Sequence, residues 1–150
     1  SVHLEVFPET PAAWRDDSLA AKMETVRTFR SSISETIEPL RKDKVIGSSL
    51  QVHVTAPAND ALAAALTALG VTRKDVYTDP ANPDDTLADY LIVSVCDLSS
   101  KTETIDVASL ADDAGFTKCE RSWKYFKADN GADITPRDAA AVAAWDVSRG

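Results

Sequence analysis

The chain has 150 residues, of which 44% are hydrophobic and 27% are charged, which is typical of one globular domain or two small ones. Its net charge of −8 and isoelectric point near 4.7 argue against a general nucleic-acid binder, because such domains are usually basic. Two cysteines, Cys96 and Cys119, are too few for a disulfide framework, and Cys96 lies in an apolar run that predicts a buried free thiol.

The sequence also argues against membrane contact and secretion. It contains no run of about 18 apolar residues, and its opening lacks the basic start and apolar middle of a secretory signal. We therefore expect a cytoplasmic protein. Because the chain opens on Ser1 without a methionine, we also expect it to be a piece of a larger protein.

The negative charge is unevenly distributed. Residues 22–44 hold six Lys or Arg against four Asp or Glu, and residues 116–127 hold four against one. Residues 75–113 hold ten Asp or Glu and a single lysine, Lys101. Two mildly basic patches are thus separated by an acidic stretch, a pattern that can repel polyanions in general and still bind a specific one.

The first predicted element is a long helix. Residues 1–14 contain Pro8 and Pro11 and predict an extended lead-in, and Asp16 or Asp17 is the expected N-cap. Apolar residues then recur every three or four positions from Leu19 to Leu40, which predicts a helix of about six turns with one buried face. Pro39 lies inside this pattern and predicts a kink or break near Ile37.

After Gly47 the pattern changes to that of a small α/β module. Leu50, Val52 and Val54 alternate with polar residues and predict a strand. A short helix over 59–70, a loop over 78–86, a buried strand over 90–96 and a second strand over 102–108 are expected to follow. The terminal helix has clear start signals, with Thr135 as N-cap, Pro136 in the first position and Asp138 three residues after the cap.

These elements predict an α+β fold in three parts. We expect residues 1–46 to hold the long helix, residues 47–115 to form a small α/β module, and residues 116–150 to form a short tail with a terminal helix; the family resemblance described below implies that the first part ends a helical bundle and the second is a junction module.

The tail retains the spacing of a double zinc knuckle without its ligands. A structural zinc site usually needs two Cys-x-x-Cys pairs, whereas this chain has Cys119-x-x-Ser122 and Thr135-x-x-Asp138. Hydroxyl groups are poor zinc ligands at neutral pH. The sequence therefore predicts a metal-free tail without a cofactor, in which Thr135 and Asp138 serve as a helix-capping box.

Three segments, "SVHLEVFPE", "KVIGSSLQVHV" and "KCERSWKY", resemble in order and spacing the C-terminal region of bacterial isoleucyl-tRNA synthetase. The resemblance implies the end of the helical anticodon-binding domain, a junction domain and a terminal double knuckle, of which only Cys119 survives among the four ligand positions. It implies isoleucine tRNA and upstream catalytic and editing domains as partners. The catalytic HIGH and KMSKS signatures are absent, so we expect no catalysis by this chain alone.

The segment "KCERSWKYFK" carries the residues expected to bind RNA. Single-stranded RNA is bound by stacking bases on aromatic rings or guanidinium groups while lysines meet phosphates. Trp123 and Tyr125 are candidates for stacking, and the resemblance implies that Arg121 and Trp123 contact the anticodon loop. The candidate phosphate ligands are Lys118, Lys124 and Lys127. Alternatively, the aromatic residues Trp123, Tyr125 and Phe126 form the core of the tail, which we favour for Phe126.

A second basic cluster, Arg41, Lys42 and Lys44, falls at the end of the long helix. It is expected either to contact RNA or to interact with the helix dipole. His3 and His53 show no signal of an acid–base site. A different hypothesis is a docking module, in which the acidic middle and the alanine-rich terminal helix contact a protein partner or other domains.

Overall fold

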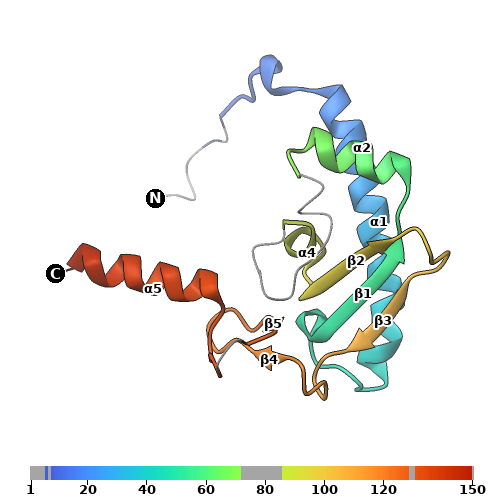
Figure 1. Ribbon diagram of the computed structural model, residues 1–150. Coiled ribbons are helices and arrows are strands. Elements are labelled where there is room, and N and C mark those ends of the chain that lie inside the picture. The colour runs from blue at the N-terminus through green and yellow to red at the C-terminus, as the bar shows by residue number, and fades with distance from the viewer. Residues whose placement is uncertain (1–5, 7, 72–85, 129–130, 150) are drawn as a thin grey trace.

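The computed structural model describes Val6 and residues 8–71, 86–128 and 131–149. It shows the predicted α+β fold, with a three-stranded sheet in the order β2-β1-β3, two helices against the sheet, and a small hairpin that leads to a terminal helix (Figure 1). The lead-in contains a 3-10 turn at Ala12–Trp14. No helix within the described ranges is long and apolar enough to cross a membrane.

The predicted long helix is confirmed as α1, Asp17–Lys42. Asp16 is its N-cap, and its carboxylate accepts a hydrogen bond from the Leu19 N–H at 2.9 Å. Val26, Ile33 and Ile37 form the buried stripe. The helix runs through Pro39 to Lys42, so the predicted break near Ile37 is wrong, whereas the predicted kink stays a prediction. Pro39 lies in the last turn, where its missing N–H removes the helical donor of the Glu35 carbonyl.

Helix α1 ends in a Schellman motif built on a lysine. The Val45 N–H donates to the Leu40 carbonyl at 2.9 Å, and the Lys44 N–H donates to the Arg41 carbonyl at 3.2 Å. Lys44 takes the left-handed position, with φ of 59°, which glycine usually fills. The turn therefore fixes the backbone from which the Lys44 side chain extends.

The sheet combines one parallel and one antiparallel pair. Strand β1, Val52–Pro57, runs parallel to β2, Val95–Ser99, and antiparallel to β3, Asp106–Ser109. Helix α2, Asp60–Ala68, lies in the connection after β1 and begins at Asn59, whose side chain accepts from the Leu62 N–H at 2.7 Å. Gly70, with φ of 78°, follows its end, and the short helix α4, Thr86–Leu91, precedes β2.

One hydrophobic core joins α1, α2 and the sheet. Val52, Val54 and Ala56 alternate along β1 and are fully buried, and they belong to the same cluster as Ile33 of α1 and Leu66 of α2. The predicted strand and helix are thus confirmed. Cys96 is a buried free thiol in this core, as expected. The core continues across the predicted boundary at residue 46, and that boundary remains a prediction.

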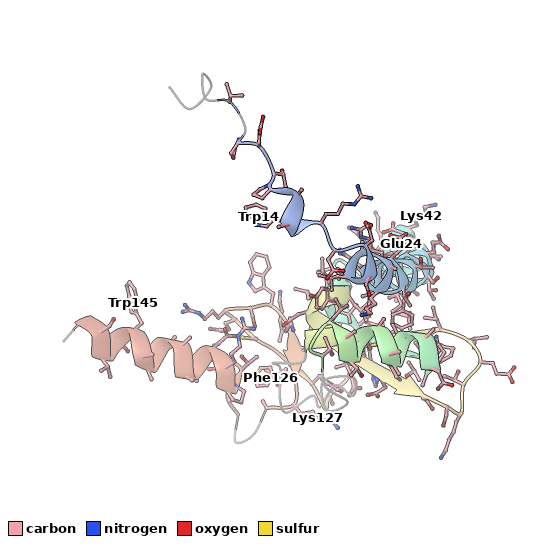
Figure 2. All side chains as sticks on the ribbon, turned by 90° about the horizontal axis from the view of Figure 1, so that it is seen from above. Trp14, Glu24, Lys42, Phe126, Lys127 and Trp145 are labelled. Carbon is pink, nitrogen blue, oxygen red and sulfur yellow. The ribbon has the colours of Figure 1, made fainter. Side chains whose placement is uncertain are left out.

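A second, smaller hydrophobic cluster joins the tail to the sheet. Strands β4, Thr117–Lys118, and β5, Tyr125–Phe126, form an antiparallel hairpin, and α5 spans Pro136–Arg149. Tyr125 packs with Val95 and Leu110. Phe126 is 1% exposed, so its predicted core role is confirmed. Helix α5 extends away from the rest of the protein in both views (Figures 1 and 2).

Two predicted strands begin later than expected. The segment 90–96 was expected to be one strand, but Tyr90 and Leu91 end α4 and β2 begins at Val95. Similarly, β3 begins at Asp106 rather than at Thr102. An apolar run does not by itself distinguish the end of a buried helix from a buried strand. Most of the predicted loop over 78–86, and His3, lie outside the described residues.

We expect replacement of Ile33 by alanine to lower the free energy of unfolding by about 2–5 kcal/mol, because a fully buried side chain would leave a cavity. Ile33 is 1% exposed. Urea denaturation of Ile33→Ala measures the loss, and Ser34→Ala, on the exposed side of the same helix, is the matched control. Equal stability of the two variants would contradict the proposed core.

Candidate nucleic-acid interface

The segment 119–124 forms a tight turn that closes the hairpin. The Cys119 N–H donates to the Lys124 carbonyl at 2.8 Å, and the Trp123 N–H donates to the Cys119 carbonyl at 3.0 Å. The Ser122 N–H also points at the Cys119 sulfur, at 3.4 Å. The cysteine sulfur is thus held inside the turn by the backbone N–H three residues later.

The structure brings the four predicted knuckle positions together, and we call Cys119, Ser122, Thr135 and Asp138 the Asp138 cluster. The Cys119 thiol donates to Asp138 Oδ2 at 3.2 Å, and the Thr135 hydroxyl donates to the same oxygen at 2.8 Å. A backbone hydrogen bond from the Glu120 N–H to the Asp133 carbonyl, at 3.1 Å, joins the hairpin turn to the segment that precedes α5. One buried carboxylate therefore connects the hairpin to the start of α5.

Thr135 is the N-cap of α5, as predicted. Its hydroxyl oxygen accepts from the Asp138 N–H at 3.2 Å, and its carbonyl accepts from the Ala139 N–H at 2.9 Å. In a complete capping box the Asp138 side chain would bind the Thr135 backbone N–H, but here it accepts from the Thr135 hydroxyl. That difference leaves the same carboxylate oxygen able to reach Cys119.

The electrostatic environment keeps Asp138 ionised. Burial acts to raise the pKa of its carboxyl group, but hydrogen bonds from Thr135, Ser122 and Cys119, together with the charge of Arg137, lower that pKa below its ordinary value. By geometry alone, Ser122 Oγ is buried without a hydrogen-bond partner among the described residues. The bonds from the Thr135 hydroxyl and the Cys119 thiol to Asp138 Oδ2 are therefore the ones that hold the carboxylate.

The donor set does not fit the structural zinc ion that the double-knuckle pattern suggests. Such an ion needs four ligands drawn from thiolates and imidazoles, whereas the cluster offers one thiol, two hydroxyls and one carboxylate. Moreover, the thiol and the Thr135 hydroxyl both donate protons to Asp138. The four side chains therefore suit a hydrogen-bonded connection between the hairpin turn and the start of α5.

Trp123 is the most unusual residue of the hairpin. Its side chain is 63% exposed, and its backbone has φ of 64°, a left-handed conformation that is rare for a bulky residue. The Lys118 ammonium lies 5.8 Å from the centroid of its indole ring, within the range of a cation–π interaction. The turn thus presents a flat aromatic surface next to a positive charge.

The remaining predicted RNA ligands of the tail divide between surface and interior. Arg121 and Lys118 are exposed beside Trp123. In contrast, the Lys124 side chain is 11% exposed and its ammonium is paired with Asp89 of α4. Tyr125 is 9% exposed. Burial leaves Lys124 and Tyr125 with little surface for a direct RNA contact. Lys127 is exposed, with its ammonium 5.6 Å from the centroid of the Phe116 ring. The candidate surface at the turn therefore consists of Lys118, Arg121 and Trp123, and Lys127 remains a predicted phosphate ligand.

The second predicted cluster lies on the surface at the end of α1. Arg41, Lys42 and Lys44 are all exposed, and Arg41 pairs with Glu38 at 3.1 Å. Figure 2 shows Lys42 extending outward, apart from Phe126 of the hairpin. The structure therefore presents two separate basic surfaces.

Sequence reasoning missed the residues that attach the hairpin to the sheet. The Ser94 hydroxyl accepts from the Tyr125 N–H at 2.7 Å and donates to the Leu50 carbonyl at 2.5 Å. The Gln51 amide donates to the Tyr125 hydroxyl at 3.3 Å. One signal was present, because Ser94 is the only polar residue in the apolar run "LIVSVC", and a buried hydroxyl needs a partner.

Comparison with known proteins shows which proteins this chain is similar to. No family model matches the chain. The isoleucine–tRNA ligase of Mesorhizobium japonicum is 34% identical over 155 residues, which cover 95% of this chain and 14% of that protein. The ligase of Brucella abortus is 37% identical over the same coverage, and that of Bradyrhizobium diazoefficiens is 32% identical over 97% of the chain.

The chain is related to the C-terminal region of isoleucine–tRNA ligases. The resemblance to isoleucyl-tRNA synthetase is thus confirmed. The chain spans about 14% of the length of these relatives, so it corresponds to one part of such a ligase.

The lowered pKa of Asp138 makes the stability of the fold depend on pH. A carboxylate whose pKa is lower in the folded than in the unfolded state stabilises the fold above the ordinary value of 3.8, and this contribution is lost as pH falls through the folded-state pKa. At neutral pH we expect Asp138→Asn to lower the free energy of unfolding by about 1–3 kcal/mol.

Urea denaturation of both proteins between pH 2 and 7 checks this prediction. The other carboxylates titrate in both proteins, so their effects largely cancel in the difference. The difference in stability is expected to shrink as the pH falls below the ordinary aspartate pKa. A difference that stays constant over the whole range would show that the charge of Asp138 contributes nothing.

We also expect the positions of the cluster to form a zinc site once they carry thiols. The triple variant Ser122→Cys, Thr135→Cys, Asp138→Cys supplies four cysteines with Cys119, and should bind one zinc ion per chain. Elemental analysis and competition with a coloured chelator measure the binding. The single variant Ser122→Cys, with two thiols, is the control and should bind far more weakly. A triple variant without zinc would show that the positions do not converge as described.

Proposed function

We propose that this chain is the tRNA-binding, non-catalytic C-terminal part of an isoleucyl-tRNA synthetase, and that it positions the anticodon arm of isoleucine tRNA. The observation that supports this most directly is Trp123, which is held in a left-handed conformation and exposed on the hairpin. The Lys118 ammonium lies 5.8 Å from the centroid of its ring, and Arg121, two residues earlier in the same turn, is exposed.

The energetics of Trp123 favour a binding role over a structural one. A left-handed backbone costs a non-glycine residue about 1–2 kcal/mol, and exposure of the indole forgoes the gain from burial. Strained, exposed residues of this kind cluster at binding sites. An unpaired base of a single-stranded loop would stack on the indole while Lys118 or Arg121 meets the adjacent phosphate.

The basic cluster of α1 would supply a second contact to the same RNA. Lys42 and Lys44 are exposed, so both are accessible to phosphates. The net charge of −8 restricts binding to these two surfaces and disfavours non-specific polyanions. Affinity is therefore expected to decrease as salt increases, because phosphate contacts release counterions.

In this proposal the chain contributes recognition, and the chemistry belongs to other domains. Catalytic and editing domains upstream of it would act on the acceptor end of the tRNA while this part holds the anticodon arm. The expectation that the chain alone does not catalyse rests on the absence of the HIGH and KMSKS signatures from its sequence.

An alternative function is a docking module without direct RNA contact. Trp145 and Val147 of α5 support it, since they are 61% and 83% exposed, and exposed apolar side chains on an extended helix suit a protein partner. Comparison of isoleucine tRNA with an unrelated tRNA in a gel-shift assay separates the two functions. Equal binding of both at low salt would favour docking.

We expect Trp123→Ala to weaken binding of an isoleucine tRNA transcript by about 1–3 kcal/mol, the typical contribution of one stacked base. Because the side chain is exposed, the variant should unfold at the same urea concentration as the wild type or a higher one. Filter binding measures affinity, and Trp145→Ala is the matched control, since its indole is equally exposed but lies on α5. Unchanged affinity of Trp123→Ala, with the fold intact, would refute the stacking role.

A further inference from the structure

The two proposed RNA surfaces come from distant parts of the chain. One is the basic cluster, Arg41, Lys42 and Lys44, and the other is the hairpin tip with Arg121 and Trp123. Both depend on a non-glycine residue in the left-handed conformation, with φ of 59° at Lys44 and 64° at Trp123. The backbone of each surface is thus held in a defined conformation. A rigid RNA arm could contact both surfaces only if their position relative to each other is also fixed.

A single side chain connects the two segments. Gln51 Oε1 accepts from the Gly47 N–H at 2.5 Å and from the Ser48 N–H at 3.1 Å, which fixes the turn three residues after Lys44. The Nε2 of the same amide donates to the Tyr125 hydroxyl at 3.3 Å. Tyr125 in turn lies two residues after Trp123. The Gln51 side chain therefore bonds to the segment that follows α1 and to the hairpin at the same time.

Two further contacts hold the hairpin in place. The Tyr125 N–H donates to the Ser94 hydroxyl, which itself donates to the Leu50 carbonyl. On the other side of the turn, the Lys124 ammonium is paired with Asp89. Figure 1 shows the hairpin beside the segment that enters β1, in agreement with these bonds. The hairpin is thus attached to the module by its backbone, by a charge and by the Tyr125 hydroxyl.

These contacts differ in what they fix. The Lys124 pair joins the hairpin to α4, and the Ser94 hydroxyl joins it to the Leu50 carbonyl. The Tyr125 hydroxyl leads instead through the Gln51 side chain to the Gly47 and Ser48 N–H groups, a few residues after Lys44. A binding surface that is already ordered in the free protein loses little conformational entropy when the ligand binds. Two contacts on one rigid body also reinforce one another, because the first sets the effective concentration of the second.

From these contacts we infer that Tyr125 and Gln51 are positioning residues, which set the hairpin tip relative to the basic cluster so that one RNA arm binds both. This inference rests on the proposed RNA-binding function and deepens it. Tyr125 is 9% exposed, so its role is exerted through Trp123 and Lys44. The sequence-based expectation that Tyr125 stacks on a base is thereby replaced by an indirect role.

The test is a set of double-mutant cycles with an isoleucine tRNA transcript. Tyr125→Phe removes only the hydroxyl and keeps the ring packed against Val95 and Leu110. We expect its affinity to fall about two- to tenfold, as for the loss of one hydrogen bond. The loss should disappear when Trp123→Ala or Lys44→Asn is already present, because positioning matters only while both surfaces bind. Asparagine tolerates the left-handed conformation of Lys44.

Controls separate positioning from a general effect on the fold. Tyr90→Phe removes a hydroxyl from a tyrosine that is 38% exposed and should leave affinity unchanged. Urea denaturation reports any loss of stability, and Gln51→Ala breaks the same connection from the other end if Tyr125→Phe folds poorly. Gln51→Ala is expected to show the same dependence on Trp123 and Lys44.

The outcomes are distinct. A loss that appears only with both surfaces intact supports the inference. An unchanged affinity for Tyr125→Phe, or an equal loss in all backgrounds, overturns it. Equal binding of isoleucine tRNA and an unrelated tRNA by the wild-type chain at low salt would overturn the proposed RNA-binding function, and this inference with it.

Discussion

The tail depends on the hydrogen bonds that converge on the Asp138 carboxylate. Its Oδ2 atom accepts from the Cys119 thiol and the Thr135 hydroxyl, and so joins a hairpin turn to a helix start. A double knuckle normally obtains this connection from four thiolates on one ion. Here the connection uses groups that donate protons to a single anion, and both halves of the joint remain aligned because each donor is fixed by its own turn. The hairpin tip is presented from this joint.

Two exposed residues of the protein have conformations that lower the stability of the fold. Trp123 is both strained and exposed, and neither property favours folding. Lys44 repeats the same conformation at the end of α1. The interior of the hairpin compensates through Phe126, Tyr125 and the paired Lys124. Aromatic and basic residues in one short segment therefore divide between an anchor that faces the module and a tip that faces solvent.

Elements with local signals could be predicted from the sequence, and contacts between distant segments could not. The spacing of Val26, Ile33 and Ile37 and the cap at Asp16 predicted α1, and Thr135 predicted the start of α5. The cluster positions followed from Cys-x-x-Ser and Thr-x-x-Asp spacing. However, burial of Lys124 depends on Asp89, which lies 35 residues earlier. The partners of Ser94, and the Tyr125 partner of Gln51, likewise lie far away in the sequence, so no periodicity could reveal them.

Helix α5 has a different basis of stability from α1. After Asp138 the side chains at 139–148 are exposed or half-buried, and half of these residues are alanine. Its outer turns therefore gain little from tertiary contacts and depend on the intrinsic helical preference of alanine. A segment of 14 residues is near the length at which isolated helices are marginal in water. Its free end should accordingly melt gradually on warming, while α1 and the sheet unfold together.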